Sequence, residues 1–472
     1  MTLSKSQYLR GLQCRKNLWL YRHRPEVATP PSPSLQAIFD QGHEVGTLAW
    51  KRFPGGKLIE EDHLHPDEAV DSTRKALGHD VLYEAGAVFD KVLIRADILA
   101  RDKLVEVKSS TEVKDVYLHD VAVQRYVLEG AGFKIKKTSL LHINNKYVRH
   151  GDVDPKGLFA ESDVTEKVNE LLPEVPMRVK EFHSVVASKD EPRIDIGEQC
   201  YAPYECPFID HCWKHVPEYS IYDIARLSWK KKDALREMGV LRVEDVPDDF
   251  ELNAAQRKQV KVARSNKPYV DYDGIGACLE RFEHPLYFLD FETVNPAIPP
   301  YDGLRPFEQL PFQASLHVRM KQGGALKHEG FLADARTDPR GPLKEWLKSR
   351  IGPKGSVLAY NASFEARCLE ELGGLGYIKE RLVDVADPFR KGFLVHPGFK
   401  GRWSIKAVLP TLVPGMDYSG LEIKDGSEAQ LAFMGLMKGT GDGVKVRKAL
   451  EEYCAQDTLG MVKLVDVLGG MR

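Results

Sequence analysis

Three apolar runs follow one another in close order near residue 100, and their spacing restricts this part of the chain to a small β-sheet. Each run has the apolar spacing of a half-buried strand. Helices are expected on either side, at residues 66–77 and 116–131, with a further strand at 138–144. The pattern therefore predicts an α/β domain whose first strands are Val81–Val88, Val92–Ala100 and Leu104–Lys108.

The length of 472 residues allows two or three domains. We expect an α/β multidomain protein with a first domain over residues 1–217, a small helical insert over 218–270 and a last domain over 280–472. A helical stretch should run to about residue 188, and the insert should be similar to a helix-hairpin-helix. The last domain should contain strands near 286–292, 312–319 and 356–360 and be mainly helical after them.

Composition and charge exclude several classes of protein. The net charge of −2 gives no global basic field, so a nucleic acid would have to bind local basic patches. The sequence contains neither the ~20 consecutive apolar residues of a membrane span nor a signal-like apolar core, so we expect a cytoplasmic protein without a membrane partner. Seven cysteines in a reduced compartment suit metal ligands or small buried residues better than disulfides.

Two carboxylates and a lysine fall on the predicted front strands. Asp97 lies in the second strand, and Glu106 and Lys108 lie in the third. Residues two apart in a strand project from one face, so Glu106 and Lys108 would share a cleft that Asp97 could join. Two carboxylates can hold Mg²⁺, which activates water for attack on a phosphodiester, and a lysine can orient that water or stabilise the phosphate charge. An ordinary surface strand with alternating Glu and Lys is the alternative interpretation.

The spacing Asp97-x8-Glu106-x-Lys108 resembles the PD-(D/E)xK nuclease core, with Ala96 at the position of the motif's Pro. This resemblance implies a restriction-endonuclease-like fold for the first domain. It also implies a metal-ligand role for His43, which matches the additional ligand of the RecB-type branch.

The RecB-type branch also carries a Q-x-x-x-Y helix, and the predicted helix at 116–131 lies where that helix belongs. Asp120 and Gln124 fall at the motif's Gln and Tyr positions. Either Gln124 takes over the role that faces the DNA or the lysine, or the helix differs locally.

Three cysteines, Cys200, Cys206 and Cys212, are separated by five intervening residues each, in a segment rich in Pro and aromatic residues. Soft thiolates suit zinc or an iron-sulfur cluster. A fourth ligand must come from elsewhere, and Cys14 is the best candidate because it too precedes an aromatic-rich apolar segment. In a Cys₃His zinc site, His211 or His215 could replace it. The other cysteines are isolated and are expected in the core: Cys278, Cys368 and Cys454.

One cysteine far upstream with three after the nuclease core resembles the iron-sulfur nucleases of the RecB-like group. That group includes the CRISPR adaptation nuclease family and the AddB-type helicase-nucleases. The resemblance implies a [4Fe-4S] cluster, with zinc as the alternative, that ties the ends of the domain together and takes no part in the chemistry.

A second set of carboxylates comes from three distant segments. Asp290 and Glu292 end an apolar strand on one face, and Glu365 lies where a strand runs into a helix. Tyr453 precedes Asp457 by one helical turn, on the same face. Four acids suit two Mg²⁺ or Mn²⁺ ions, one helping to form the attacking hydroxide and the other stabilising the leaving oxygen, while the tyrosine orients the water.

This set resembles the DEDD exonucleases of RNase H-like fold, in the variant with Tyr in the last motif. Residues 361–365 match the second motif, with Glu365 at the usual Asp position. The longer side chain could shift the second ion or mark a degenerate site. Asp384 and Asp387 follow as auxiliary ligands or, more simply, as caps of a turn before Pro388.

Almost the whole chain resembles a group of prokaryotic RecB-family-like proteins whose C-terminal half is catalogued as a domain of unknown function. Three segments carry this resemblance: Leu3-Ser-Lys-Ser-Gln-Tyr-Leu-Arg-Gly-Leu-Gln-Cys14, Cys206-Pro-Phe208 and Tyr360-Asn-Ala-Ser-Phe-Glu365. It implies a metal-dependent nuclease with two active sites, an exonuclease on DNA rather than RNA. The alternative is a nucleic-acid-binding protein in which one or both folds have lost catalysis. A redox enzyme lacks support because the chain has no G-x-G-x-x-G fingerprint in a suitable context.

Two basic segments, residues 1–24 and 255–267, could contact phosphates or could be solvated helix faces. The helical insert could likewise hold a nucleic-acid backbone. The chain has no helicase P-loop, so a helicase or repair partner would be a separate protein.

Overall fold

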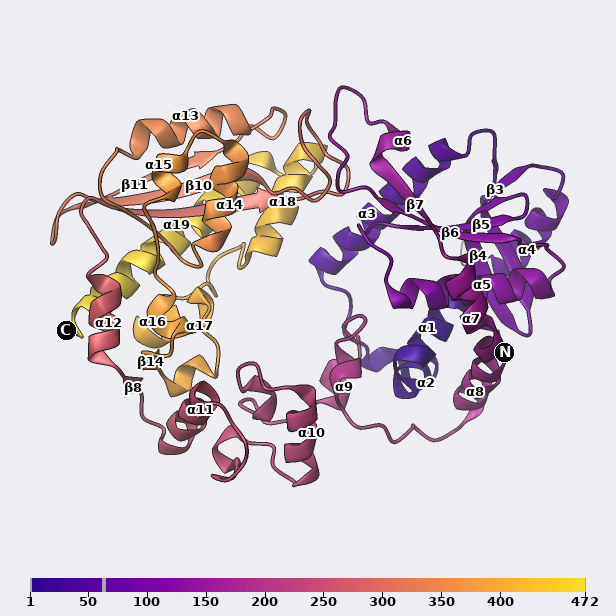
Figure 1. Cartoon of the computed structure of the whole chain (residues 1–472), viewed down its shortest axis with the longest axis horizontal. Helices are drawn as coiled ribbons and strands as arrows, with labels where there is room; N and C mark the ends of the chain where they lie inside the picture. The colour runs from indigo at the N-terminus through magenta and orange to yellow at the C-terminus, as the bar shows by residue number, and fades with distance from the viewer. Residues whose placement is uncertain (1, 62–64, 472) are drawn as a thin grey trace. The chain divides into compact units, whose positions relative to one another are not determined.

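The computed structural model describes residues 2–61 and 65–471. Its chain divides into two compact units, each an α/β structure with a mixed sheet (Figure 1). Unit 1 comprises residues 1–215 and 296–308, and unit 2 comprises residues 216–295 and 309–472. The predicted insert thus belongs to unit 2, and residues 296–308, which we expected in the last domain, belong to unit 1.

Residues 296–308 join unit 1 through burial and hydrogen bonds. Ala297 is fully buried in a cluster with Val45 and Tyr83. The Arg149 guanidinium donates hydrogen bonds to the carbonyl oxygens of Pro299 and Pro300, at 2.8 and 2.7 Å.

Unit 1 is organised around a sheet of seven strands in the order β2-β3-β4-β5-β6-β7, with β1 also paired to β4. The strands predicted between residues 81 and 108 are confirmed as three antiparallel neighbours. The helical stretch predicted to run to about residue 188 is present over residues 165–187, and a short helix and β7 precede it. The strands are β1 (Leu3–Ser4), β2 (Lys57–Leu58), β3 (Val81–Phe89), β4 (Val92–Ala100), β5 (Lys103–Lys108), β6 (Lys137–Ile143) and β7 (Phe159–Asp163).

One edge of β4 is shared between two strands. β1 pairs with its beginning, at Val92 and Leu93, whereas β5 pairs with its end, Ile98–Ala100. The sheet therefore opens between β1 and β5. Asp97 lies at that opening, one residue before the β5 pairing begins.

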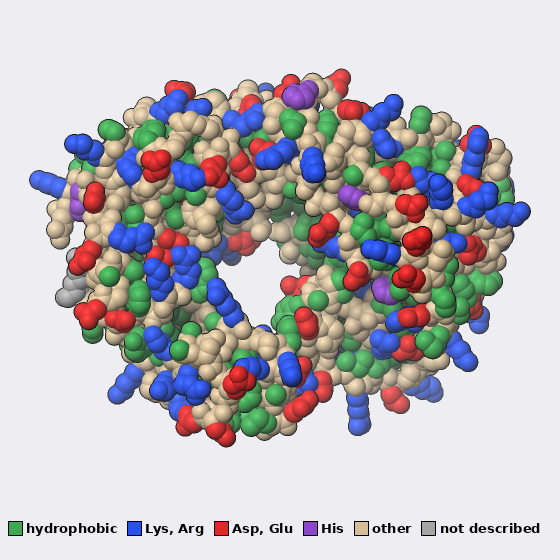
Figure 2. Space-filling model, in the orientation of Figure 1, with side chains coloured by type: hydrophobic (Ala, Val, Ile, Leu, Met, Phe, Trp, Pro, Cys, Tyr) green, Lys and Arg blue, Asp and Glu red, His purple; other side chains and the backbone are tan. Residues whose placement is uncertain are grey.

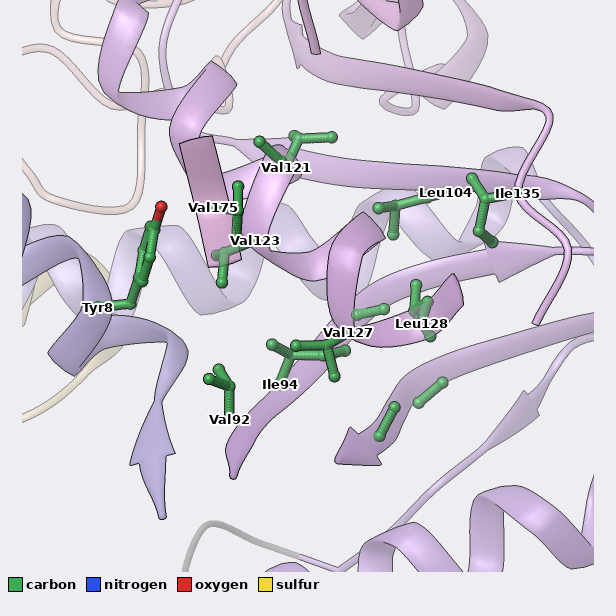
Figure 3. Packing of buried hydrophobic residues seen from close by; sticks show 14 of the residues in the cluster. Tyr8, Val92, Ile94, Leu104, Val121, Val123, Val127, Leu128, Ile135 and Val175 are labelled. Atoms are coloured by element: carbon green, nitrogen blue, oxygen red, sulfur yellow. The ribbon is translucent and has the colours of Figure 1, made fainter. Parts of the chain in front are cut away.

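Helices bury both faces of this sheet. On one face, α1, α5 and α8 pack against the sheet to form the larger core. In this core the rings of Tyr8 and Phe182 lie edge to face, with 5.3 Å between their centroids. Figure 3 shows part of this packing, with Val127 of α5 beside Ile94 of β4. The helices of unit 1 are α1 (Lys5–Gln13), α2 (Arg15–His23), α3 (Pro33–Ala49), α4 (Pro66–Lys75), α5 (Asp115–Gly130), α6 (Pro155–Leu158), α7 (Thr165–Leu171), α8 (Val175–Ala187) and α9 (Ile209–Cys212).

Unit 2 contains a five-stranded sheet in the order β11-β10-β9-β12-β13. β9, β10 and β11 are antiparallel, and β12 and β13 run parallel to β9. The strands near 286–292, 312–319 and 356–360 are confirmed, whereas the sequence did not indicate β11, β13 or β14. The strands are β8 (Tyr269–Val270), β9 (Leu286–Val294), β10 (Leu310–Arg319), β11 (Leu326–Leu332), β12 (Ser356–Ala359), β13 (Leu382–Asp384) and β14 (Leu394–Val395).

Side chains of the central strand β9 point alternately to an apolar core and to an acidic face. Leu289 and Phe291 pack with residues of α13 and α14, whereas Asp290 projects toward α19. The helices are α10 (Trp229–Glu237), α11 (Ala254–Ser265), α12 (Tyr272–Leu279), α13 (Arg340–Arg350), α14 (Ser363–Leu372), α15 (Gly376–Lys379), α16 (Asp387–Arg390), α17 (Ile405–Leu412), α18 (Gly426–Lys438) and α19 (Gly443–Gly469). A search of the described helices for one long and apolar enough to cross a membrane finds none.

Many cations of the two basic segments contact this chain itself. In α11, Lys258 donates to the Gly392 carbonyl and Arg264 to Asp248. Near the N-terminus, Arg15 pairs with Glu181 at 2.7 Å. Figure 2 shows Lys and Arg side chains interspersed with acids over the visible face. These contacts give several of the basic residues a structural role within the chain.

Candidate functional site

Six side chains of unit 1 meet at the opening of its sheet, and we call them the front cluster: Lys5, Asp97, Glu106, Lys108, Asp120 and Gln124. Glu106 and Lys108 share one face of β5, as predicted, and Lys108 Nζ lies 2.6 Å from Glu106 Oε1. Asp97 joins from β4, where its Oδ2 accepts a hydrogen bond of 2.7 Å from the Val107 amide. The structure thus brings the three predicted residues together.

Two members of the front cluster were not predicted as site residues. Asp120 of α5 accepts a hydrogen bond of 2.7 Å from Lys108 Nζ. Lys5, at the start of α1, lies 3.0 Å from Glu106 and 3.3 Å from Asp120. The pairing of β1 with β4 brings Lys5 to the opening of the sheet. Lys5 follows β1 directly and carries no local motif of its own, so only the fold reveals its position.

Burial and charge act in opposite senses on the front acids. Burial, together with the charges of Asp120 and Asp97, raises the pKa of Glu106 to about 7. Burial also raises the pKa of Asp97, although Lys5 and Lys108 oppose it. For Asp120 burial is outweighed by Lys108 and Lys5, which lower its pKa. The front cluster therefore contains one carboxylate that ionises readily, Asp120, and two that hold their protons more tightly than usual, Asp97 and Glu106.

The remaining predicted front residues differ in position. Gln124 donates to Glu106 Oε2 at 2.7 Å and to Asp120 Oδ1 at 2.9 Å, so it holds the two acids rather than facing Lys108. His43 is exposed on α3. Among the described residues, His43, Asp97 and Glu106 do not bring three ligand atoms within 4.8 Å of one another. The structure does not assemble His43 into a closed cation site.

The four predicted cysteine ligands line one cavity, and we call them the cysteine cluster: Cys14, Cys200, Cys206 and Cys212. Cys14 lies at the junction of α1 and α2, and Cys212 ends α9. Burial raises the pKa of Cys206 to about 11 and also raises that of Cys14. His211, the alternative ligand, instead lies 3.5 Å from Glu191. The structure therefore gathers the donor set that includes Cys14.

Four acids of unit 2, of which only Asp290 is half-buried rather than buried, lie beside two tyrosines and a cysteine. We call these side chains the rear cluster: Asp290, Glu292, Glu365, Tyr418, Tyr453, Cys454 and Asp457. Asp290 and Glu292 come from β9, Glu365 from the first turn of α14 and Asp457 from α19. Burial raises the pKa of Asp457 to about 6. The pKa values of Asp290 and Glu292 are raised well above the usual range by burial and by the neighbouring acids. Each charge in this cluster makes the next one more costly.

Glu365 belongs to the same electrostatic group. Burial, followed by the charge of Asp290, raises its pKa, and only 2% of its surface is exposed. Asp384, the possible auxiliary ligand, accepts hydrogen bonds from the amides of Asn361 and Ala386, both at 2.9 Å. Asp387 pairs with Lys391 at 2.9 Å. The interpretation of these two acids as supports of a turn fits those contacts.

Sequence reasoning missed three side chains beside the rear acids. The Tyr418 hydroxyl donates to Asp457 Oδ1 at 2.5 Å, and Lys406 Nζ lies 3.2 Å from the Tyr453 hydroxyl. Cys454, which we placed in the core, is fully buried, but its Sγ lies 3.4 Å from Asp290 Oδ2. The sequence position of Cys454, between Tyr453 and Asp457 on one helix, was the available signal.

Comparison with known proteins gives two matches. Residues 287–404 match the model of a domain of unknown function, DUF2779. A protein of Ureaplasma parvum serovar 3 (strain ATCC 700970), described as uncharacterized protein UU173, is 27% identical over 222 residues, which cover 41% of this chain and 31% of that protein. The chain thus spans about a third of the length of this relative. The domain match contains Asp290, Glu292 and Glu365 and ends before Tyr453.

Proposed function

We propose that this chain is a metal-dependent nuclease with two active centres, of PD-(D/E)xK type in unit 1 and of DEDD, RNase H-like type in unit 2. One observation carries the proposal: four carboxylates from three distant segments, three of them buried and Asp290 half-buried, converge in the rear cluster. Burial raises the pKa values of all four, and the neighbouring acids raise those of Asp290, Glu292 and Glu365 further, so a bound divalent cation would offset a real electrostatic cost. The mixed five-stranded sheet, with the first acids on its central strand, supports the same fold type.

The rear donors fit hard divalent ions of the Mg²⁺ and Mn²⁺ class, since they are carboxylate oxygens. Asp290, Glu292, Glu365 and Asp457 would hold such ions, which supply an activated water and stabilise the leaving oxygen. The Tyr453 hydroxyl orients the attacking water. Lys406, at 3.2 Å, fixes that hydroxyl and adds a positive charge for the phosphate. Tyr418 holds Asp457 in place through its hydrogen bond.

In the front cluster, Asp97 and Glu106 would hold the cation, and Lys108 would stabilise the charge on the phosphate. In the structure, the Lys108 ammonium forms ion pairs with Glu106 and Asp120, at 2.6 and 2.7 Å. The substrate phosphate competes with these two acids for the lysine. Gln124 keeps both carboxylates oriented during that exchange.

The cysteine cluster fits a [4Fe-4S] group better than one zinc ion. Around zinc, with bonds of about 2.3 Å, four sulfurs would lie roughly 3.8 Å apart. Among the described residues, these cysteines do not bring three sulfurs within 4.8 Å of one another. A larger inorganic core suits that spread, and it would tie the α1–α2 junction to residues 200–212.

The nuclease proposal is tested on end-labelled single- and double-stranded DNA and RNA with Mg²⁺ or Mn²⁺. Wild type, Lys108→Ala and Asp290→Ala are compared after anaerobic purification. We expect DNA to be degraded from its ends, with each substitution removing a distinct part of the activity. The product ladders then give the polarity of each centre.

A nucleic-acid-binding protein is the second candidate, and the front cluster favours it for unit 1. Lys5 and Lys108 together already neutralise much of the charge of Glu106 and Asp120. If wild type binds the labelled strands but cuts none of them with either ion, this second function replaces the first.

A further inference from the structure

A thiol lies among the rear acids. Cys454 Sγ is 3.4 Å from Asp290 Oδ2, and one ligand atom from each of Asp290, Glu292 and Cys454 lies within 4.8 Å of the other two. The described residues contain no other group of three His, Cys, Asp or Glu side chains that meets this limit. The residue that completes the most compact donor set is therefore a cysteine rather than a fourth acid.

The spacing of these three atoms is close to that required by a single ion. Zinc lies about 2.3 Å from a thiolate sulfur and roughly 2.0–2.2 Å from a carboxylate oxygen. Two ligands of one ion can consequently be no more than about 4.5 Å apart. A change of a few tenths of an ångström, within reach of ordinary side-chain rotation, would bring the atoms of Asp290, Glu292 and Cys454 into that range.

Glu365 provides a second, independent indication that a ligand belongs here. Its Oε2 atom is buried, and it has no hydrogen-bond partner within the described part of the chain. The side chain is 98% buried, since 2% of its surface is exposed. A buried carboxylate oxygen without a donor is costly unless a cation or a water reaches it. Glu365 lies in the first turn of α14, which packs against β9, the strand that carries Asp290.

The kind of donor selects the kind of ion. Mg²⁺ prefers oxygen ligands in octahedral geometry, whereas thiolates favour softer ions. We infer that the position beside Cys454 in the rear cluster holds an ion of the zinc class through Asp290, Glu292 and the thiolate of Cys454, while Glu365 and Asp457 are left for the Mg²⁺ or Mn²⁺ of the proposed nuclease. This inference rests on the proposed function and names one of the two cations of its rear centre.

Binding is an exchange of a proton for the ion and involves no oxidation. The Cys454 thiol now donates its hydrogen toward Asp290. On binding, the S–H bond breaks, a metal–sulfur bond forms, and the proton leaves to the buffer. Asp290 then loses a hydrogen-bond donor and gains the cation in its place.

Cobalt reports a thiolate ligand directly, because a Co²⁺–thiolate bond gives a charge-transfer absorption in the near ultraviolet. Co²⁺ is titrated into the full chain, purified anaerobically, as wild type, Cys454→Ser and Cys368→Ser. Cys368 is the matched control: it is also fully buried, and it lies one turn after Glu365 on α14. The cysteine cluster is identical in all three proteins, so difference spectra isolate the rear cluster.

We expect wild type and Cys368→Ser to bind one more cobalt-thiolate equivalent than Cys454→Ser. Zn²⁺ should displace this cobalt, and a tenfold excess of Mg²⁺ should not. Equal bands in all three proteins, or displacement by Mg²⁺, would overturn the inference. The proposed nuclease stands apart from this outcome, because cleavage of labelled DNA with Mg²⁺ is measured separately on the same samples.

A second measurement covers the case in which Cys454→Ser fails to fold, as judged by circular dichroism. Zinc X-ray absorption is recorded on wild type whose cysteine cluster has been shown to contain iron. A sulfur neighbour at about 2.3 Å supports the Cys454 bond, and a shell of oxygen and nitrogen alone contradicts it.

Discussion

The Lys5 ammonium lies 3.0 Å from Glu106 Oε1, although 101 positions separate the two residues in the sequence. Lys5 also reaches Asp120 at 3.3 Å, and its side chain is only 23% exposed. The side chain that follows β1 thus belongs to the same electrostatic group as the acids of β5 and α5. Burial alone would lower the pKa of Lys5, but the charges of Asp120 and Glu106 outweigh it and raise that pKa.

Replacing Lys5 by Met should lower the free energy of unfolding of unit 1 by about 3 kcal/mol, because the substitution leaves buried carboxylates with one cation fewer. Urea unfolding at pH 8, followed by circular dichroism, measures the loss. Lys103→Met is the matched control: Lys103 lies on the same sheet, is 24% exposed and pairs with Glu161. It should cost less than about 1 kcal/mol. Equal losses of unfolding free energy in the two variants would mean that the ion pairs of Lys5 stabilise unit 1 no more than that of Lys103.

His317 should contribute stability to unit 2 that is lost between pH 6.5 and pH 4. Burial lowers the pKa of this histidine to about 4, so the unfolded chain takes up its proton at a higher pH than the folded one. The stabilisation is complete above pH 6.5 and is lost as the pH falls toward 4, a difference of about 3 kcal/mol. Urea unfolding at several pH values measures it.

His317→Gln should flatten this part of the pH profile, and His284→Gln, at an exposed histidine, should leave it unchanged. The raised pKa values of the rear acids have the opposite effect on the pH profile, because they make the folded unit more stable as the pH falls. The difference between the two variants therefore isolates His317, and parallel profiles would refute its role.

Tyr418→Phe should reduce the activity of the rear centre, or its affinity for Mn²⁺, by about 10- to 100-fold. The substitution removes the hydrogen bond of 2.5 Å that holds Asp457 and leaves the ring in place. Tyr287→Phe is the control, because the Tyr287 hydroxyl on β9 accepts from the Gly352 amide, at 3.2 Å. Mn²⁺ titration by calorimetry and the labelled-DNA assay give the two readouts. A Tyr418→Phe protein with wild-type values in both would show that Asp457 needs no such support.

Cys212→Ser should abolish the iron and sulfide content of anaerobically purified protein. The loss of a bound group that stabilises only the folded state should also lower the melting temperature. Cys278→Ser, a buried cysteine on α12, should keep both values. Chemical iron and sulfide analysis with thermal unfolding tests this. Zinc without iron in wild type would instead favour the Cys₄ zinc alternative.

Much of the candidate chemistry could be predicted from the sequence because it rests on local patterns. Glu106 and Lys108 are two apart on a strand, and Tyr453 and Asp457 are one turn apart on a helix, so their common faces follow from backbone geometry alone. Cys14 was harder to place, since it lies 186 positions before Cys200, and it was chosen because it too precedes an aromatic-rich apolar segment.

The rest depended on contacts that no local pattern encodes. Lys5 reaches the front cluster only because β1 pairs with β4, and Tyr418 reaches Asp457 from a segment without a motif. The strand β11 has an exposed, polar sequence at the sheet edge, so it lacks the apolar alternation on which strand prediction relies. Cys454 is buried, as predicted, but an isolated cysteine on a helix gives no sign of the contact with Asp290.

Because residues 296–308 belong to unit 1, this unit can be completed only late in the synthesis of the chain. Ribosomes add roughly 5–20 residues per second, so Leu3 and Lys5 emerge roughly 15–60 s before the last segment of their own unit. During that interval the cluster that contains Val45 and Tyr83 lacks Ala297, the buried residue that completes it. Until residue 308 has left the ribosome, unit 1 therefore lacks a segment that covers part of its apolar surface.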